Sequence, residues 1–308
     1  MFNVKNCIII SSLLIITALL SHPTYCLAGT LGIKSEPKIE GSIRDSEVII
    51  SGSYIAQNIG NEKAREVLPI LSIGGWKWAG EPVELAPNES YTWKINDTFP
   101  IEQLSCKHDS SCASLDLPIR GKFPIFIHKL YQDMNGYQFS SSEVLSITIG
   151  EVTSEENFRL RAPAVTHKVI IKPDGENFLS EMLIQNIGAQ PVSIAPKFFT
   201  TREFNIVTQP NSGNIEPSKQ FITQSKIENF KGIKGSAYPI FGVVQWNDSG
   251  VRNTIIAQEI ATIKAIKKQG PLGLKISNQS FYIYACITSM IGMLILLQIF
   301  VIGPRKKA

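Results

Sequence analysis

One sequence framework occurs twice in this chain. A QNIG tetrapeptide at residues 57–60 recurs at 185–188, and a proline-centred segment at 85–91 is echoed at 215–221. The FPIF run at 123–126 is echoed by YPIF at 238–241, and an aromatic residue, Tyr131 or Trp246, follows each of those prolines by seven positions. Matches that keep the same order along the chain indicate a duplicated domain.

Each copy has the composition of a small β-domain. Short β-branched runs, such as residues 47–55, are bounded by Gly, Asn or Pro, and no stretch keeps a helical period. About seven short strands in about 110 residues fit an immunoglobulin-like sandwich. We therefore predict an all-β body of two tandem immunoglobulin-like β-sandwiches, at residues 29–150 and 166–266, joined by a linker at 151–165.

The first copy carries an insertion that contains two cysteines. From Pro87 to Pro124 there are 37 residues, against 22 from Pro217 to Pro239, so the first copy has 15 more. Cys106 and Cys112 lie in this excess, near residues 104–118. In an oxidising compartment such a pair is expected to form a disulfide. With His108 and Asp109 between them, a soft-metal site is the alternative, for which zinc would need a fourth ligand; we disfavour it because thiols outside the cytoplasm usually oxidise.

Two uncharged apolar blocks predict the membrane topology. The block at 7–20 suits a signal peptide, residues 1–28, with an uncleaved anchor as the alternative. The block at 281–302 has 22 residues, enough for about 33 Å of helix, which predicts one C-terminal transmembrane α-helix. A polar stalk at 267–280 precedes it, and the basic stub at 303–308 is expected in the cytoplasm. The sandwiches are then expected outside the cytoplasm, in the periplasm or on the cell surface.

The net charge argues against nucleic acid as a partner. The chain is formally +4, and Lys5 together with the three basic residues at 305–307 accounts for that whole excess. The predicted external region is therefore neutral and lacks the basic footprint that nucleic-acid binding needs.

Several motifs together resemble a known class of modules. The run NIGNEKAREV at 58–67 is similar to the N-x-G-N-x-x-A-x-x-V hallmark of prokaryotic Ig-like modules of the CARDB and NEW3 type, which also occur in S-layer-related proteins. Their later pattern is similar to residues 85–90 and 238–250, although Asn88 stands where those families usually have Gly. The resemblance implies fold and surface display, and it says little about function.

Motifs for catalysis are absent from the sequence. It contains no Gly-x-Ser-x-Gly elbow, His-Glu-x-x-His, P-loop or Gly-x-Gly-x-x-Gly. His108, His128 and His167 lie far apart, so we expect no enzyme, no cofactor and no metal. Asp, Asn and Gly at 133–136 and 247–250 permit calcium loops, but hairpin turns are the commoner outcome.

Two tryptophans form the candidate partner-binding site. In GGWKWAG at 74–80, Trp76 and Trp78 share one face of an extended segment. If exposed, they would stack on a sugar or anchor a protein. The alternative is that they fill the gap between the sheets. The second copy has KFFTTRE at 197–203 instead, and a feature present in one copy alone is a candidate for function.

The sequence thus predicts a non-catalytic, membrane-anchored envelope protein that presents two Ig-like domains to a surface protein or polysaccharide. The alternative is an accessory subunit of a membrane enzyme or export complex, docked through its transmembrane helix.

The cysteine pair gives a first testable prediction. Replacing both Cys106 and Cys112 by Ser should leave the protein folded, because the predicted disulfide closes only a short inserted loop, with an entropic contribution of about 2–3 kcal/mol at most. Urea unfolding of the purified chain measures the change. Global unfolding of the double variant would instead make this loop part of the core.

Overall fold

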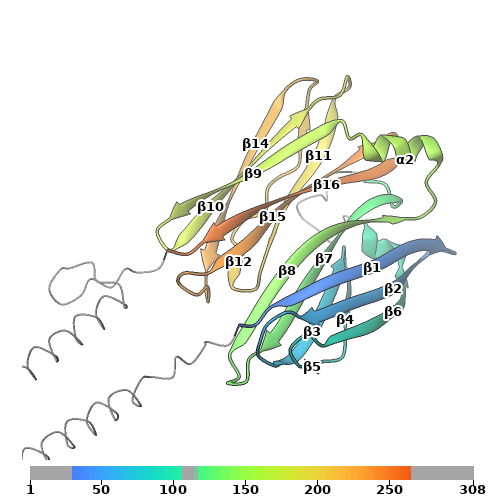
Figure 1. Ribbon diagram of the computed structural model, residues 1–308. Helices are drawn as coiled ribbons and strands as arrows, with labels where there is room; N and C mark the ends of the chain where they lie inside the picture. The colour runs from blue at the N-terminus through green and yellow to red at the C-terminus, as the bar shows by residue number, and fades with distance from the viewer. Residues whose placement is uncertain (1–29, 106–114, 116, 265–308) are drawn as a thin grey trace, which may run out of the picture. The chain divides into compact units, whose positions relative to one another are not determined.

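The computed structural model describes residues 30–105, 115 and 117–264, and this part of the chain is built almost entirely of strands (Figure 1). Its single α-helix, α2 (Ser154–Arg161), has eight residues. No helix within these described ranges has the length and apolar character to cross a membrane. The predicted signal peptide, both cysteines and the predicted span at 281–302 lie outside the described residues.

The first set of strands forms two layers of antiparallel neighbours. One layer has the order β1-β2-β6, and the other has β8-β7-β3, with β4 and β5 on the remaining edge of β3. A single parallel bridge between β1 and β8 joins the layers. The bounds are β1 (Ile33–Arg44), β2 (Glu47–Asn58), β3 (Ala64–Ile73), β4 (Trp76–Ala79), β5 (Val83–Leu85), β6 (Ser90–Pro100), the 3-10 turn η1 (Ile101–Leu104), β7 (Gly121–Gln132) and β8 (Gln138–Ile149).

The second set repeats this arrangement after the linker. One layer has the order β9-β10-β14-β12 and the other β16-β15-β11-β13. The bounds are β9 (Val165–Asp174), β10 (Asn177–Asn186), β11 (Val192–Thr200), β12 (Phe204–Ile206), β13 (Gly213–Ile215), β14 (Gln220–Asn229), β15 (Ala237–Asp248) and β16 (Val251–Thr262).

This strand order is that of the immunoglobulin fold. In chain order, the first, second and fifth of its strands share one sheet, and the third, sixth and seventh share the other. Both sets follow that rule when the short edge strands β4 and β13 are left out of the count, and β12 supplies the additional strand of the first sheet in the second set. The predicted all-β, Ig-like sandwich architecture is therefore confirmed for the described residues.

The repeated QNIG motif has a structural cause in its asparagine. The side chain of Asn58 has no exposed surface; its Nδ2 donates to the carbonyls of Glu62 (2.7 Å) and Leu85 (3.0 Å), and its Oδ1 accepts from Gly60 N (2.9 Å). One amide therefore ties the β2–β3 loop to β5. In the second sandwich the buried Asn186 makes the same three bonds, to Gln190 O, Ile215 O and Gly188 N.

The repeated proline turn also has a backbone cause. Pro87 is followed by Asn88 at φ 65°, and Glu89 N donates to Ala86 O at 3.0 Å. A proline followed by a residue with positive φ is the pattern of a type II turn, which usually has Gly directly after the proline, as the third of its four residues. Ser218, after Pro217, has φ 62°, so both copies keep the turn without glycine.

The predicted linker contains a short helix that the lack of a helical period in the sequence did not indicate. Helix α2 lies within it, and a capping box starts it: Glu156 N donates to Thr153 Oγ1, and the Glu156 carboxylate accepts from Thr153 N. The T-x-x-E signature is visible in the sequence. The helical period is not visible, because the two large apolar residues of the helix do not share a face: Leu160 is buried, whereas the side chain of Phe158 is 71% exposed.

The buried asparagines give a prediction about stability. Asn58→Ala should lower the free energy of unfolding by about 2–3 kcal/mol, because it removes two donors and leaves the buried carbonyl of Leu85 without its amide partner. Gln57→Ala is the matched control: its side chain makes one long bond, 3.4 Å to Asn88 O, and its loss should cost less than about 1 kcal/mol. Urea unfolding of the purified chain compares them, and equal effects would contradict the structural role of Asn58.

Candidate functional site

Trp76 belongs to the core of the first sandwich. Its ring stacks on Phe99 with centroids 5.2 Å apart, its Nε1 donates to Asp97 Oδ2 at 2.8 Å, and only 4% of its surface is exposed. The interpretation of Trp76 as an exposed partner contact is therefore corrected: the alternative, that it fills the gap between the sheets, describes it.

Trp78 faces the same way, but part of its surface stays accessible to solvent. In the antiparallel pairing of β4 with β3, Trp76 lies opposite Ile73 and Trp78 opposite Leu71, both of which are buried. Residues directly opposite each other share a face of the sheet, so both indoles point inward. Trp78 is half-buried against the core, and Lys77 between them is exposed. The sequence spacing showed that the indoles share a face, but not which one.

The two sandwiches meet through the outer faces of their β7 and β15 sheets. Phe126 of β7 stacks on Phe199 of β11 with centroids 5.3 Å apart. Val144 of β8 and Phe241 and Val243 of β15 are buried in the same cluster. An apolar contact at the centre of an interface is what a fixed pair of domains needs, because hydrophobic burial is the main source of association energy.

The β7 sheet of the first sandwich and the β16 sheet of the second are also joined through a backbone bridge. Gly121, the first residue of β7, lies beside Arg252 of β16 in a parallel bridge, and Arg252 N donates to Arg120 O at 2.8 Å. Gly121 has φ 117°, and a Cβ there would lie 2.2 Å from the carbonyl oxygen of Arg252. Only glycine allows this approach.

The side chain of Arg252 extends this contact into the first sandwich. It is 3% exposed, its guanidinium lies 4.2 Å from the ring centroid of Phe123, and it donates to the carbonyls of Leu104 (3.3 Å) and Leu117 (3.4 Å). Burial lowers the pKa of Arg252 to about 10, so it stays charged at neutral pH. It therefore connects the second sandwich to both flanks of the cysteine insertion.

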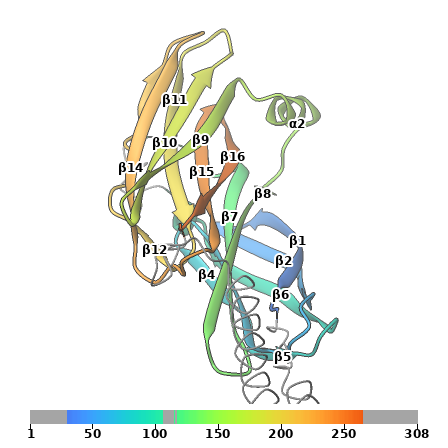
Figure 2. The ribbon, with the colours of Figure 1, turned by 60° about the vertical axis from the view of Figure 1, so that its left-hand side comes forward.

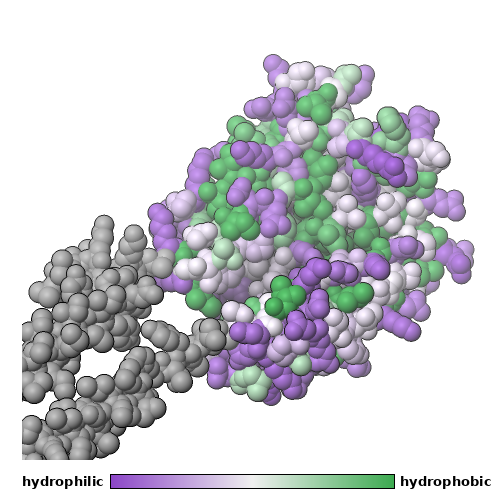
Figure 3. Space-filling model, in the orientation of Figure 1, coloured by the Kyte–Doolittle hydropathy of each residue, from purple (hydrophilic) through white to green (hydrophobic). Residues whose placement is uncertain are grey.

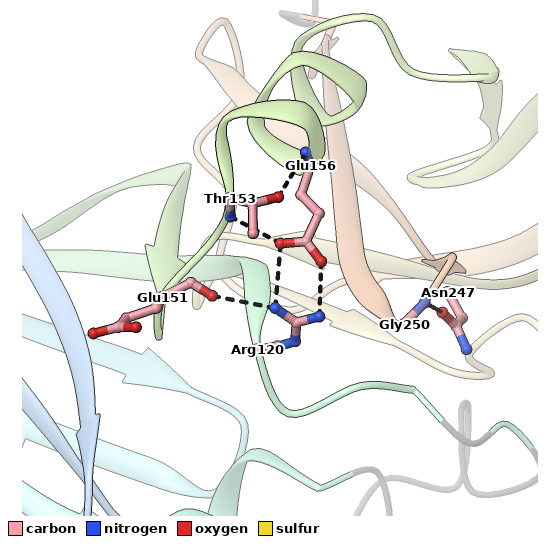
Figure 4. Close-up of polar contacts among 6 residues, drawn as sticks. All are labelled: Arg120, Glu151, Thr153, Glu156, Asn247 and Gly250. Carbon is pink, nitrogen blue, oxygen red and sulfur yellow. Dashed lines mark hydrogen bonds and ion pairs between the residues drawn. The ribbon is translucent and has the colours of Figure 1, made fainter.

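A second polar contact fixes the linker helix to the start of β7 (Figure 4). The guanidinium of Arg120 donates to both carboxylate oxygens of Glu156, at 2.7 and 3.2 Å, and to the carbonyl of Glu151 at 3.3 Å. Hydrogen bonds from the Thr153 backbone and from Arg120 lower the pKa of Glu156. The same carboxylate thus caps α2 and holds it against the first sandwich.

A polar cluster flanks the apolar contact on its other side. His128 Nδ1 lies 2.7 Å from Ser142 Oγ, and Ser140 Oγ donates to both oxygens of Glu203, at 2.7 and 2.6 Å. Arg202 donates to Gln138 Oε1 at 3.0 Å. Burial lowers the pKa of His128, and the charges of Arg202 and Lys77 add to this effect, while Glu203 opposes it.

The turns at 133–136 and 247–250 are hairpin turns, as the sequence favoured. Asp133 Oδ1 accepts from the backbone of Asn135 and Tyr137, and Asn247 Oδ1 accepts from Gly250 N (Figure 4). These carboxamide and carboxylate oxygens close their own turns. No group of three or more His, Cys, Asp or Glu side chains with the geometry of a metal site occurs among the described residues.

No local sequence pattern marked the residues that join the two sandwiches and the linker helix, which we call the junction. Arg120 and Glu156 are 36 positions apart, and Ser140 and Glu203 are 63 apart. The QNIG and proline motifs revealed two copies, but no local pattern indicates which outer faces of those copies meet. Gly121 was the one available signal, since a glycine at the start of a strand often marks a close backbone approach.

No family model and no curated protein matches the chain. Among solved structures, it is similar to a FixG-related protein from Vibrio parahaemolyticus (12% identity, 33% of this chain and 97% of that one, TM-score 0.26). It is also similar to the YadV chaperone (13%, 74% and 99%, 0.29) and to the periplasmic chaperone SfaE (9%, 75% and 100%, 0.28). Likenesses this low carry no functional argument, and the Ig-like assignment rests on the strand order.

The partly buried His128 gives a prediction about pH. The pKa of His128 is lowered in the folded protein, so the unfolded chain binds its proton first as the pH falls. The stability that depends on neutral His128 is fully present above the unfolded pKa, about 6.5, and is lost as the pH falls toward the folded value, at about 1 kcal/mol per pH unit.

The variant His128→Gln, which is neutral at every pH, should lose less stability than the wild type between pH 7 and pH 5.5. His167→Gln is the companion variant in the second sandwich: burial also lowers the pKa of His167, so this variant too should lose less stability than the wild type, although the bond of its ring nitrogen to Gly242 O at 2.9 Å opposes the shift. Urea unfolding at the two pH values measures the difference. An unchanged pH dependence in His128→Gln would place the titration elsewhere.

Proposed function

We propose that this protein is a non-catalytic, membrane-anchored envelope protein. It presents two Ig-like domains, of the kind found in CARDB and NEW3 modules, to a surface protein or polysaccharide. The observation that carries the proposal is the junction, in which the apolar contact, the shared sheet and the buried side chain of Arg252 all connect the two sandwiches. Two domains held this way offer one composite surface to a partner.

The membrane anchor in this proposal comes from the sequence. The apolar segment at 281–302 and the basic residues at 305–307 supply the span and its orientation. A protein held at the membrane by one helix, with its folded part outside the cytoplasm, is suited to display rather than to transport. The neutral charge of the external region favours recognition through aromatic contacts and hydrogen bonds, with little dependence on salt.

The absence of catalysis in this proposal is supported by the state of the histidines. His128 bonds to Ser142 within the junction and His167 to a backbone carbonyl, and burial lowers the pKa of each. Each ring is thus engaged in packing between strands. His108 lies outside the described residues.

The partner surface that we propose is the open edge of β4, where the inward-pointing indole of Trp78 keeps part of its surface accessible. Trp78 retains accessible surface beside the exposed Lys77, whereas Trp76 is sealed against Phe99. Half-buried aromatic side chains are well suited to binding, because they are already ordered and lose little entropy on contact.

The experiment is a matched pair of tryptophan variants in the full-length chain. Trp78→Ala should abolish recovery of the partner from solubilised native envelopes, and it should lower the melting temperature less than Trp76→Ala does, because Trp78 is only half-buried. Trp76→Ala should lower the free energy of unfolding by about 3–5 kcal/mol, because it leaves a cavity in the core. The same recovery with a chain whose span has been exchanged tests the anchor.

Retention of the partner by the span-exchanged chain, together with its loss in Trp78→Ala, supports the proposal. Loss on exchanging the span alone favours an accessory subunit docked through its helix. Equal recovery with Trp78→Ala and the wild type would remove β4 as the partner surface.

A further inference from the structure

The described chain begins and ends at the same end of the paired sandwiches. At its start, Thr30 N donates to the side chain of Asn61, and Ile33 pairs with Asn58 at the beginning of β1. At its finish, Thr262, the last residue of β16, pairs with Ala237. The start of β1 therefore lies beside the loop at 59–63, which follows β2, and the end of β16 lies beside the loop at 230–236, which precedes β15.

Two parallel pairings place these points on the same side. β1 runs parallel to β8, so β1 begins on the side where the β7–β8 hairpin turns. β7 runs parallel to β16, so that hairpin lies on the side where β16 ends. Figures 1 and 2 show β7 and β16 running in the same direction in both views. Helix α2 follows β8 and therefore lies at the opposite end.

Three loops at this shared end expose large apolar side chains. They are the loops at 59–63, 133–137 and 230–236, which we call the apolar end. The exposed side chains and their exposed fractions are Ile59 (61%), Met134 (52%), Tyr137 (68%), Phe230 (65%) and Ile233 (53%). Single exposed apolar residues are ordinary, but hairpin and loop tips are normally polar, and here three tips share the feature.

The three loops are held in place by hydrogen bonds. Ile59 N donates to Gly32 O at 2.8 Å, and Met134 N donates to Glu62 Oε1 at 3.4 Å, which connects the first two loops. In the second sandwich, Ile233 N donates to Tyr238 Oη at 2.8 Å, and Phe230 N donates to a carbonyl of the β11–β12 turn. The apolar side chains therefore project from fixed backbone.

Charges at the apolar end are balanced. The three loops carry Lys63, Lys231 and Lys234 together with Glu62 and Asp133, and Lys234 pairs with Glu176 of the adjoining β9–β10 turn at 3.5 Å. A partner recognised there is therefore selected by its apolar character. Elsewhere, on the face seen in Figure 3, apolar surface over the second sandwich is interrupted by polar side chains.

The sequence after β16, the last strand, indicates what the apolar end faces. Sixteen residues, 265–280, separate the described chain from the apolar segment at 281–302. Sixteen residues reach at most about 55 Å when fully extended. If that segment crosses the bilayer, the end at which β16 finishes is kept within this distance of the lipid surface.

We propose that the apolar end contacts the outer surface of the lipid bilayer. The loops would place Phe230 and Ile233 of one sandwich, and Ile59, Met134 and Tyr137 of the other, into the headgroup region. Aromatic and aliphatic side chains partition into this interface, and a phenol such as that of Tyr137 keeps its hydroxyl hydrated there. The inference rests on the membrane anchor proposed above, and it adds which end of the body meets the membrane.

The test uses the full-length chain in phosphatidylcholine vesicles with isotopically labelled acyl chains. A photoreactive benzoylphenylalanine replaces Phe230 in one variant, Tyr137 in a second and Phe158 in a third. Phe158 is the matched control, because it is an aromatic residue of similar exposure (71%) on α2 at the opposite end. Carbonate extraction followed by flotation shows separately whether each chain is embedded.

We expect lipid adducts at positions 230 and 137 to exceed those at 158 by at least tenfold, and to be unchanged by 0.5 M NaCl because the local charges are balanced. Embedded chains that label lipid equally at all three positions, or at none, would overturn the inference and leave the anchor intact. Chains that carbonate extracts from the vesicles would overturn the anchor and the inference with it.

Discussion

The approach of Gly121 to Arg252 is the contact on which the arrangement of the two sandwiches depends. It brings the backbones of β7 and β16 together without a side chain between them, and a Cβ at Gly121 would lie 2.2 Å from a carbonyl oxygen. Because the bridge is parallel, it fixes the direction of one sandwich against the other. The rings of Phe126 and Phe199, one from each sandwich, are then within reach of each other.

This arrangement explains why chemically distinct contacts surround one apolar centre. Arg252 is buried over Phe123 with two carbonyl acceptors, and on the other flank Ser140 of the first sandwich donates to Glu203 of the second. Buried polar groups are costly unless they are hydrogen-bonded, so each of them requires a particular placement of the opposite sandwich. Apolar contact supplies the attraction, and the polar groups select one orientation.

The same orientation has a functional consequence. With the linker helix at one end, the opposite end carries both limits of the described chain and three loops with exposed apolar side chains. In the proposed function this end faces the bilayer, while the open edge of β4 is left for a partner. In this proposal the repeated framework provides stability, and the loops at 59–63, 133–137 and 230–236 together with β4 provide the surfaces.

The sequence by itself determined the fold of each sandwich. The QNIG and proline motifs mark contacts local to one copy, such as the amide of Asn58 and the positive φ of Asn88, and such contacts leave a repeated pattern. Only the tertiary structure decided that Trp76 faces inward, because alternation along a strand is the same for either face. It also decided the junction, because residues such as Ser140 and Glu203 are far apart in the chain and meet only when two outer faces pack together.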